Sequence, residues 1–536
     1  MRFRLRPTQW SLASAIVAVL TANLVGCTKC GTSAPPGRGL APLTMLLPRT
    51  AQAVFLIPRL RSLEPAIQKL ELLKLTTLAA QLQGFESGRD LFSAVVAQVA
   101  IDFRLPSALA KAGIDPEGAF ALVIPAGGDA YAVIPVQDLA RFHDALAAVA
   151  RNRIGTAVET VSDIAGQKVT SFAPNGSPNP DLGFIVRAGF AFVAAAAMVG
   201  QLPGHAAIDA EQSLALEPTL AAVLKRSGAT SLAYAWLSPR FAWSSSLAPS
   251  GVTLVVDITG QRLRVRAHAP WATGSTLSAL EVQPPPSQSL LQYLPDDSFL
   301  VARFAGPPDR LGPMLQRLVG KAMDRAFDDV LANLAPGIIA SLSLSPSAVL
   351  SSMPVLDVRQ TNPFHFFHFV ALASIRDREK ARQLLSQSPA LGSRMGVRIE
   401  ERQEQGERIF ASTYAQGEGA HLALVGQTAA IGSPLETLLG TVHRLKSPSG
   451  AAQGPLRDPK LRAELDGPAA MVIDLPCLAS SIKNLPTSSW GVGGFAIRAA
   501  ALRWLTALED LRGLSVHVSG SEQILELEVS LHFAGT

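Results

Sequence analysis

Apolar and polar positions alternate in two ways along this chain, with a period of two in some segments and near 3.6 in others. The period of two is clear in "RLRVRAHA", residues 262–269, and in "ILELEVSLHF", residues 524–533, where one face of each segment is polar. Such segments predict antiparallel strands, and the segments between them predict amphipathic helices. The pattern therefore predicts an α+β fold in which a mainly antiparallel sheet carries helices packed on one side.

The same order of elements occurs twice. Six segments of the first half match six of the second in pattern, and the first five keep an offset of about 240 positions. A long-period repeat of this kind predicts two homologous halves. The matched positions include Pro48 with Pro295, Asp138 with Asp377, Gly166 with Gly406, and Pro218 with Pro459.

Domain boundaries follow from this repeat and from composition. The stretch "EVQPPPSQS" predicts a semi-rigid linker because consecutive prolines favour extended backbone. The predicted organisation is a signal peptide over 1–26, a lipidated tether over 27–42, a first α+β domain over 43–280, a linker over 281–289 and a second α+β domain over 290–536.

Within each half, short local signals place the turns. Asp138 and Asp377 each follow a predicted strand and precede a helix, so their carboxylates are expected to accept from free amides of the first helical turn. Hairpin turns are predicted at Gly166 and Gly406, and two more around Ala188 and Gln427. One or two helices are expected between the first strand and about residue 112.

The N-terminal segment has the features of a secretory signal. Three arginines in the first six residues precede "WSLASAIVAVLTANL", an uncharged run that as a helix would span only about 22 Å, short of a bilayer core of about 30 Å. Leu24-Val25-Gly26-Cys27 resembles the bacterial lipobox, which implies that Cys27 becomes the mature N-terminus and carries acyl chains such as palmitate. A plain secretory signal with an incidental cysteine is the alternative. Thr28 after the cysteine favours sorting to the outer membrane.

Charge and cysteine content further narrow the functional classes to which the protein can belong. The chain has 47 basic and 42 acidic residues, and without the three leader arginines the balance is 44 − 42 = +2, with no dense basic cluster. We therefore expect no nucleic-acid partner. Besides Cys27, only Cys30 and Cys477 remain, which can pair or stay free. No second close pair of Cys or His accompanies Cys27 and Cys30, so zinc is not expected.

The two halves differ in one insertion. The offset grows by about 24 residues before the last matched segment, in "KNLPTSSWGVGGFAIRAAALRWLTALED". A helix with an apolar stripe is predicted there, either packed on the second half or serving as a docking element. The candidate interaction element consists of Trp490, Phe495, Leu502 and Trp504.

Motifs for chemistry are missing from the sequence. It has no Gly-x-Ser-x-Gly elbow and no phosphate-binding loop of the Gly-x4-Gly-Lys type. His365 and His368 in "FHFFHF" lie in a predicted strand, where positions three apart face opposite ways, so joint metal ligation is not expected. The sequence therefore predicts no catalytic residue, no metal and no cofactor.

A tandem pattern of structural motifs resembles a family of uncharacterised bacterial envelope proteins. It consists of a Leu-Pro entry to a strand, an Asp before a helix and a Gly-x-x-[Val/Ile] hairpin. The resemblance implies a signal peptide or lipobox and a tandem α+β body, and it implies no activity. The residues that carry it are Leu47-Pro48, Leu294-Pro295, Asp138, Asp377, Gly166 to Val169, and Gly406 to Ile409.

These observations favour a membrane-anchored bacterial envelope lipoprotein that acts as a non-enzymatic binding or scaffold protein, with an envelope protein as its expected partner. The alternative is a periplasmic carrier of a lipid or another apolar ligand, which the apolar strands around Phe184–Ala197 motivate. A cryptic hydrolase is a third hypothesis and requires Ser, His and an acid to converge in the fold.

Overall fold

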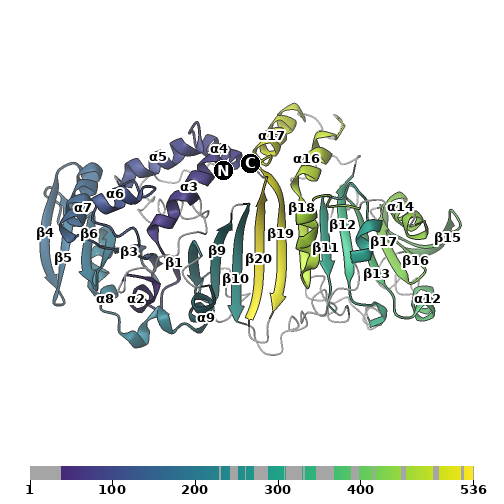
Figure 1. Cartoon of the computed structure of the whole chain (residues 1–536), viewed down its shortest axis with the longest axis horizontal. Coiled ribbons are helices and arrows are strands. Elements are labelled where there is room, and N and C mark those ends of the chain that lie inside the picture. The colour runs from purple at the N-terminus through teal and green to yellow at the C-terminus, as the bar shows by residue number, and fades with distance from the viewer. Residues whose placement is uncertain are drawn as a thin grey trace. The chain divides into compact units, whose positions relative to one another are not determined.

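A computed structural model gives the fold (Figure 1). It describes residues 38–99, 101–227, 231–241, 251–259, 261–270, 288–306, 308, 329, 332–345, 367–387, 398–414, 417–447, 454–486, 494–520 and 524–534. The chain forms two compact units, unit 1 up to Pro270 and unit 2 after it. The predicted leader, most of the tether and most of the predicted linker lie outside the described residues.

Unit 1 is built on an antiparallel sheet in the order β10-β9-β8-β1-β2-β3-β7-β6-β5-β4. Strand β4 pairs with β5 and ends the order, as the left side of Figure 1 shows. The strands are β1 (Ala53–Ile57), β2 (Phe120–Ile124), β3 (Tyr131–Pro135), β4 (Ala157–Ile164), β5 (Gln167–Pro174), β6 (Leu182–Arg187), β7 (Phe190–Ala195), β8 (Ala233–Leu237), β9 (Val252–Thr259) and β10 (Arg262–Pro270).

Unit 2 has an antiparallel sheet in the order β20-β19-β18-β11-β12-β13-β17-β16-β15-β14. Adding ten to each strand number of unit 1 gives this order. The strands are β11 (Leu300–Phe304), β12 (Ile338–Leu344), β13 (Phe367–Ser374), β14 (Arg398–Glu404), β15 (Glu407–Tyr414), β16 (Gly417–Val425), β17 (Thr428–Ser433), β18 (Ala469–Asp474), β19 (Leu511–Gly520) and β20 (Ile524–Phe533).

Helices connect the strands in both units, and the predicted α+β class is confirmed. In unit 1 they are α2 (Leu40–Met45), α3 (Leu63–Leu72), α4 (Lys74–Leu82), α5 (Gly88–Val99), α6 (Pro106–Lys111), α7 (Leu139–Ile154), α8 (Leu202–Ala206) and α9 (Pro218–Ser227). The described helices of unit 2 are α12 (Arg378–Ser386), α14 (Leu435–Lys446), α15 (Pro459–Ala463), α16 (Leu475–Lys483) and α17 (Gly494–Ala507).

Helices cover both faces of each sheet, so the prediction of helices on one side was wrong. In β1, Leu56 packs with residues of α2, α8 and α9, whereas Ile57 packs in a second cluster with residues of α3 and α7. In unit 2, Val301 packs with residues of α14, and Leu300 with residues of α16. The physical reason is that central strands such as "AVFLI" and "FALVI" are apolar on both faces, so each face requires a cover.

The segment after β1 also differs from the prediction. Four helices, α3 to α6, replace the expected one or two, and they reach residue 111. The first break comes at Leu73, whose backbone is extended (ψ 132°), and the second follows Gly84, whose φ is +87°. A glycine takes that left-handed conformation without the penalty that a side chain would add.

The local signals, by contrast, are confirmed. Asp138 accepts a hydrogen bond from the amide of Arg141 at 3.2 Å, and Asp377 accepts one from Lys380 at 3.0 Å. The β4–β5 and β14–β15 hairpins turn at Gly166 and Gly406, both with positive φ. These turns lie at equivalent places in the two units.

Candidate functional site

A surface groove of about 890 Å³ lies in unit 1, between the first turn of α7 and the ends of β4, β5 and β6. Since the Asp138 cap begins α7 at Leu139, this local signal also positions one wall of the groove. The lining residues, here called the unit 1 groove, are Leu139, Ala140, His143, Val161, Gly166, Gln167, Lys168, Thr170, Phe184, Ile185, Val186 and Arg187.

Large apolar side chains line this groove and face solvent. Val161 is 59% exposed, Leu139 52% and Val186 37%, while Phe184 is buried and packs edge-on against Phe142 of α7. Val161 pairs with Thr170, which in turn pairs with Phe184, so all three side chains share the sheet face that α7 covers. The three neighbouring strands therefore present one continuous apolar strip.

The polar groups of the groove differ in how they are satisfied. His143 Nε2 lies 2.8 Å from Glu159 Oε1, and this hydrogen bond raises the pKa of His143. Arg187 donates to the backbone carbonyls of Ala206 and Ile208, which carry no net charge. Lys168 is exposed and makes no ion pair within the part of the chain that the structure describes.

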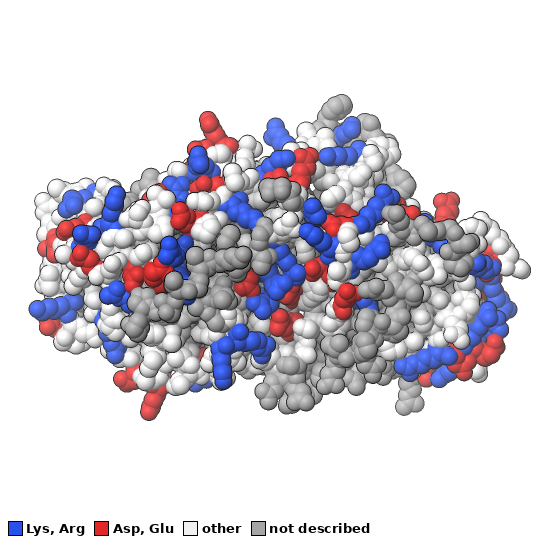
Figure 2. Space-filling model, viewed as in Figure 1, with Lys and Arg blue, Asp and Glu red and all other residues white. Residues whose placement is uncertain are grey.

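Unit 2 carries different residues at the same places. Counting from the hairpin turns, Val161 corresponds to Glu401 and Lys168 to Arg408, and these two form an ion pair. Counting from the helix caps, Leu139 corresponds to Arg378. Figure 2 shows basic and acidic atoms side by side at the right end of the face in view, where Figure 1 labels β15 and α12. The apolar strip thus belongs to unit 1.

A second polar cluster, in unit 2, brings together Ser, His and an acid. Ser515 Oγ lies 3.0 Å from His532 Nε2 and donates to Glu464 Oε2 at 3.0 Å; His517 Nε2 lies 2.8 Å from that same oxygen. A serine that donates to the carboxylate accepts from the imidazole, so His532 holds a proton where a general base needs a free nitrogen. Ser515 is also fully buried. This geometry gives the hydrolase hypothesis no support.

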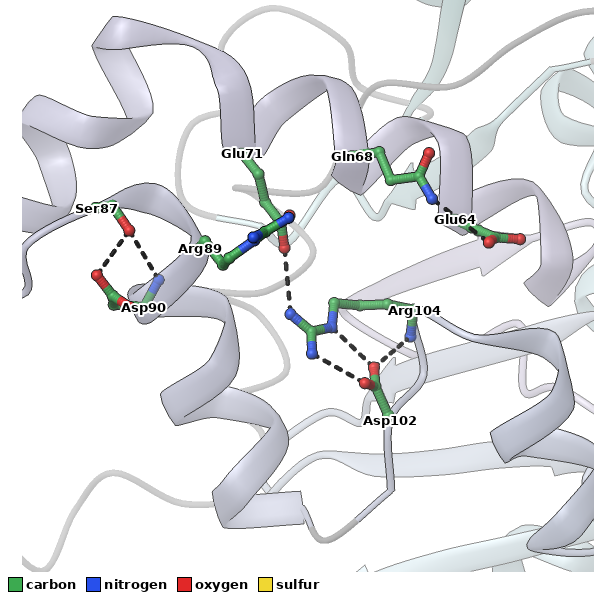
Figure 3. Close-up of polar contacts among 8 residues, drawn as sticks. All are labelled: Glu64, Gln68, Glu71, Ser87, Arg89, Asp90, Asp102 and Arg104. Atoms are coloured by element: carbon green, nitrogen blue, oxygen red, sulfur yellow. Dashed lines mark hydrogen bonds and ion pairs between the residues drawn. The ribbon is translucent and has the colours of Figure 1, made fainter.

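A third cluster centres on Arg104 of unit 1 (Figure 3). Its guanidinium makes two hydrogen bonds to Asp102, at 2.8 and 2.9 Å, and one to Glu71 of α3 at 3.2 Å. The bond to Arg104 lowers the pKa of Asp102. Every charge in this cluster has an opposite partner. The cluster is therefore a structural link between α3 and the segment after α5.

Metal ligands do not converge among the described residues. His368 lies in β13, as the strand prediction requires, and burial lowers its pKa; His365 is outside the described residues. Cys477 is free and half-buried, and burial raises the pKa of its thiol to about 11. Cys30 lies outside the described residues.

The structure describes only some of the site residues that the sequence predicts. Cys27 and Trp490 lie outside it, and Phe495 lies in α17 with its side chain undescribed. Leu502 is half-buried on α17, and Trp504 is 49% exposed. Within the described residues, no helix is both long enough and apolar enough to span a bilayer.

Sequence reasoning missed the unit 1 groove. Its one visible signal was that "AVETVSDI" has valines where the matched "RIEERQE" has charges. That difference acquires meaning only once β6 and α7 are known to flank the hairpin.

Comparisons with known proteins add little to this picture. No family model and no curated protein matches the chain. A solved structure, described as crystal form I of TP0453, is similar over 49% of this chain and 94% of that chain, with 9% identity and a TM-score of 0.25. A likeness at that level carries no argument about fold or function.

Proposed function

We propose that this chain is a lipid-anchored, non-enzymatic binding protein of the bacterial envelope, attached through Cys27 and binding its partner in the unit 1 groove. The observation that carries the binding site is the exposure of Leu139, Val161 and Val186 on one strip. Exposed apolar patches on soluble surfaces are typical of interaction sites. The lipobox supports the anchor.

We further propose that the two units are homologous halves that arose by duplication. Their equal strand order and the similar offset of the first five matched segments support this origin. Duplication also accounts for the contrast between the halves: one copy keeps a charged, ion-paired hairpin, while the other presents the apolar strip. Only unit 1 is then the binding half.

Two kinds of partner fit a groove of this type. A scaffold role requires a segment of an envelope protein, and the carrier alternative requires a lipid or another apolar molecule. The volume of about 890 Å³ lies within the range of small-ligand sites, about 300–1,000 Å³, which favours a small molecule. The carrier alternative therefore gains an observation that sequence reasoning lacked.

The anchor is tested by replacing Cys27 with serine and following labelled palmitate and membrane fractionation. We expect the wild-type chain to take up label and sediment with membranes, and the variant to lose both, because two or three acyl chains hold a protein at a bilayer. A variant that stays membrane-bound at the same mass would contradict the proposal.

The binding site is tested separately with a photo-crosslinking residue at Val161 in living cells. Val158 is the matched control, since it lies on the same strand, is 46% exposed and faces the opposite side of the sheet. We expect an adduct of defined mass from position 161 and none from position 158. Equal or no crosslinking at the two positions would remove the groove as the binding site.

A further inference from the structure

We propose that two copies of this chain associate through the outer edge of β4, which joins both unit 1 sheets into one antiparallel sheet about a two-fold axis at Thr160. This inference goes beyond the proposed function, since it concerns the edge of the sheet rather than the groove. Its supports are the exposure of β4, the direction of its backbone groups and the register in which the strand matches itself.

Strand β4 ends the unit 1 sheet and is exposed on both faces. Among the residues that the structure describes, it pairs with β5 alone, over all eight of its residues and without a bulge. Figure 1 shows it outermost in unit 1. The four consecutive residues 158–161 are exposed. The sequence "AVETVSDI" also lacks Pro, Lys and Arg, the residues that commonly block pairing at a sheet edge.

The hairpin turn fixes which backbone groups of β4 point outward. Ala165 and Gly166 form a two-residue turn with φ of +53° and +76°, so the closing pair Ile164–Gln167 exchanges both hydrogen bonds. Bonded and non-bonded pairs alternate in an antiparallel ladder, so the even-numbered residues of β4 bond to β5. Pro174, which has no N–H to donate, accordingly pairs with an odd-numbered residue. The residues whose N–H and C=O groups point away from β5 are Ala157, Glu159, Val161 and Asp163.

Strand β4 matches a second copy of itself in one register. About an axis at Thr160, the two Thr160 side chains face each other and Glu159 faces Val161. Asp163 then faces Ala157, so no like charges lie opposite each other. An axis at Val161 would set Glu159 opposite Asp163, and an axis at Glu159 would set two Glu159 side chains together. An axis nearer the turn would leave fewer residues paired.

The equivalent edge of unit 2 is unsuited to this pairing. Counted from the hairpin turns, Thr160 corresponds to Glu400, so the same axis would bring two Glu400 side chains together. It would also set Arg398 opposite Arg402, a second pair of like charges. Within its own chain, Glu400 is ion-paired with both arginines. Unit 2 therefore carries the charges that protect an edge, and it supplies the control variants.

The expected dimer is weak in solution and closed. One strand from each copy makes a small interface, and small interfaces are typical of transient complexes. The contact uses the same surface on both copies, so it ends at two chains rather than continuing into a fibre. Under the proposed anchor, both copies lie at one membrane surface, which raises their effective concentration.

Opposite charges at position 160 test the axis. Sedimentation of the full chain with Cys27→Ser, at concentrations up to about 1 mM, measures the dimer without any effect of acyl chains. Thr160→Glu, which copies Glu400, and Thr160→Lys should each weaken dimerisation roughly fivefold, and their equimolar mixture should restore it. Position 160 lies on the sheet face opposite Val161, so these variants leave the groove unchanged. Glu400→Lys is the matched control and should have no effect.

A disulfide traps the same contact. The two Thr160 residues would form a non-bonded pair with Cα atoms about 4.5 Å apart, a separation that a disulfide spans. The three native cysteines are first replaced through Cys27→Ser, Cys30→Ser and Cys477→Ser. Under mild oxidation Thr160→Cys should then give a covalent dimer, while Glu400→Cys in unit 2 should stay largely monomeric.

The proposal is overturned if neither sedimentation nor Thr160→Cys yields a dimer, if the mixed Glu and Lys variants fail to associate, or if Glu400→Cys crosslinks as readily. A covalent dimer without a sedimenting one supports the contact and bounds its affinity. In the photo-crosslinking experiment, a dimer adds an adduct of two chain masses at positions 158 and 161 alike. Thr160→Glu removes that adduct, and the groove is judged by the adducts that remain.

Discussion

Units 1 and 2 share one strand order but differ in what they place at equivalent positions. The hairpin at the end of unit 1 exposes Val158 and Val161, whereas Arg398, Glu400 and Glu401 occupy the hairpin of unit 2 and are ion-paired. The comparison indicates that strand-pairing and turn signals are enough to give both units the same strand order. The chemistry of the surface is set independently of it, and this is where function has room to diverge.

The largest expected effect concerns a core position that the units fill in opposite ways. Leu56 in β1 is fully buried and pairs with Tyr234, while the equivalent Arg303 in β11 is 4% exposed and pairs with the smaller Ala470. Arg303 donates to the carbonyl of Leu465 at 2.9 Å. Because Tyr234 fills the space beside Leu56, Leu56→Arg should destabilise unit 1 by about 4 kcal/mol through an unpaired buried charge.

The reciprocal variant sharpens this prediction. Arg303→Met keeps the length of the side chain and removes Nε and Nη2, which have no hydrogen-bond partner in the structure as described. Unit 2 should stay within about 1 kcal/mol of wild type or become more stable. Hydrogen exchange, followed separately for peptides of each unit, measures both effects. A large loss in Arg303→Met would show that the guanidinium stabilises unit 2.

The next largest expected effect concerns the residues that hydrogen-bond to the start of each capped helix, α7 in unit 1 and α12 in unit 2. Gly113 has φ +73° and accepts from the amides of Gln137 and Asp138, and a Cβ there would lie 2.2 Å from the carbonyl oxygen of Asp138. Gly113→Ala should therefore cost about 3 kcal/mol, from the backbone penalty and the clash together. The free energy of unfolding in denaturant provides the measurement.

In unit 2, a side chain rather than a glycine carbonyl bonds to the backbone at the start of the capped helix. Asn333 accepts from the amide of Asp377 at 3.1 Å and donates to its carbonyl at 2.8 Å. Asn333→Ala should cost about 1 kcal/mol, because the amide of Asp377 loses its partner, whereas its carbonyl still accepts from the amide of Ala381 at 3.0 Å. If Asn333→Ala cost more than Gly113→Ala, the backbone argument for unit 1 would be wrong.

The smallest effect is the pH dependence that His143 gives to unit 1. The bond with Glu159 raises the pKa of His143 above 6.5, so its contribution to stability is fully present below pH 6.5 and is lost as the pH rises through the folded-state pKa. The His143 side chain is 32% exposed, which limits the contribution to about 0.5 kcal/mol. His143→Gln should lower stability at pH 5.5 and have no effect at pH 8.5.

Unit 2 provides the control for this titration. Arg382 stands at the equivalent helical position, pairs with Glu379 at 2.7 Å and stays charged over the whole range. Arg382→Gln should change stability equally at both pH values. A stability difference for His143→Gln that grows with pH would mean that the sign of the linkage is wrong.

Local features of the fold could be predicted from sequence, because their causes lie within a few residues. Asp138 and Asp377 cap helices through amides three positions later, and Gly166 and Gly406 turn hairpins between adjacent strands. Which faces of the sheet the helices cover was harder to predict. The two faces of β1 are covered partly by α2 and α3, which are near it in the sequence, and partly by α7 and α8, which lie more than 80 residues away.

The candidate site shows the same limit. Its residues come from α7, β4, β5 and β6, and none of them is unusual alone. Val161 in a polar hairpin becomes informative only beside Phe184, which β5 separates from it in the sheet. Likewise, Ser515 and Glu464 meet although 51 positions separate them, and no motif records that contact.

The ion-paired hairpin of unit 2 makes the two units respond differently to ionic strength. Salt shortens the reach of charges to about 10 Å at 0.1 M and weakens the pairs around Glu400 and Glu401, while sulfate strengthens the drive to cover the valines of β4. Rising sulfate should therefore loosen one hairpin and make the other adhere more readily. The same rise in salt concentration is thus expected to weaken interactions in one unit and to strengthen them in the other.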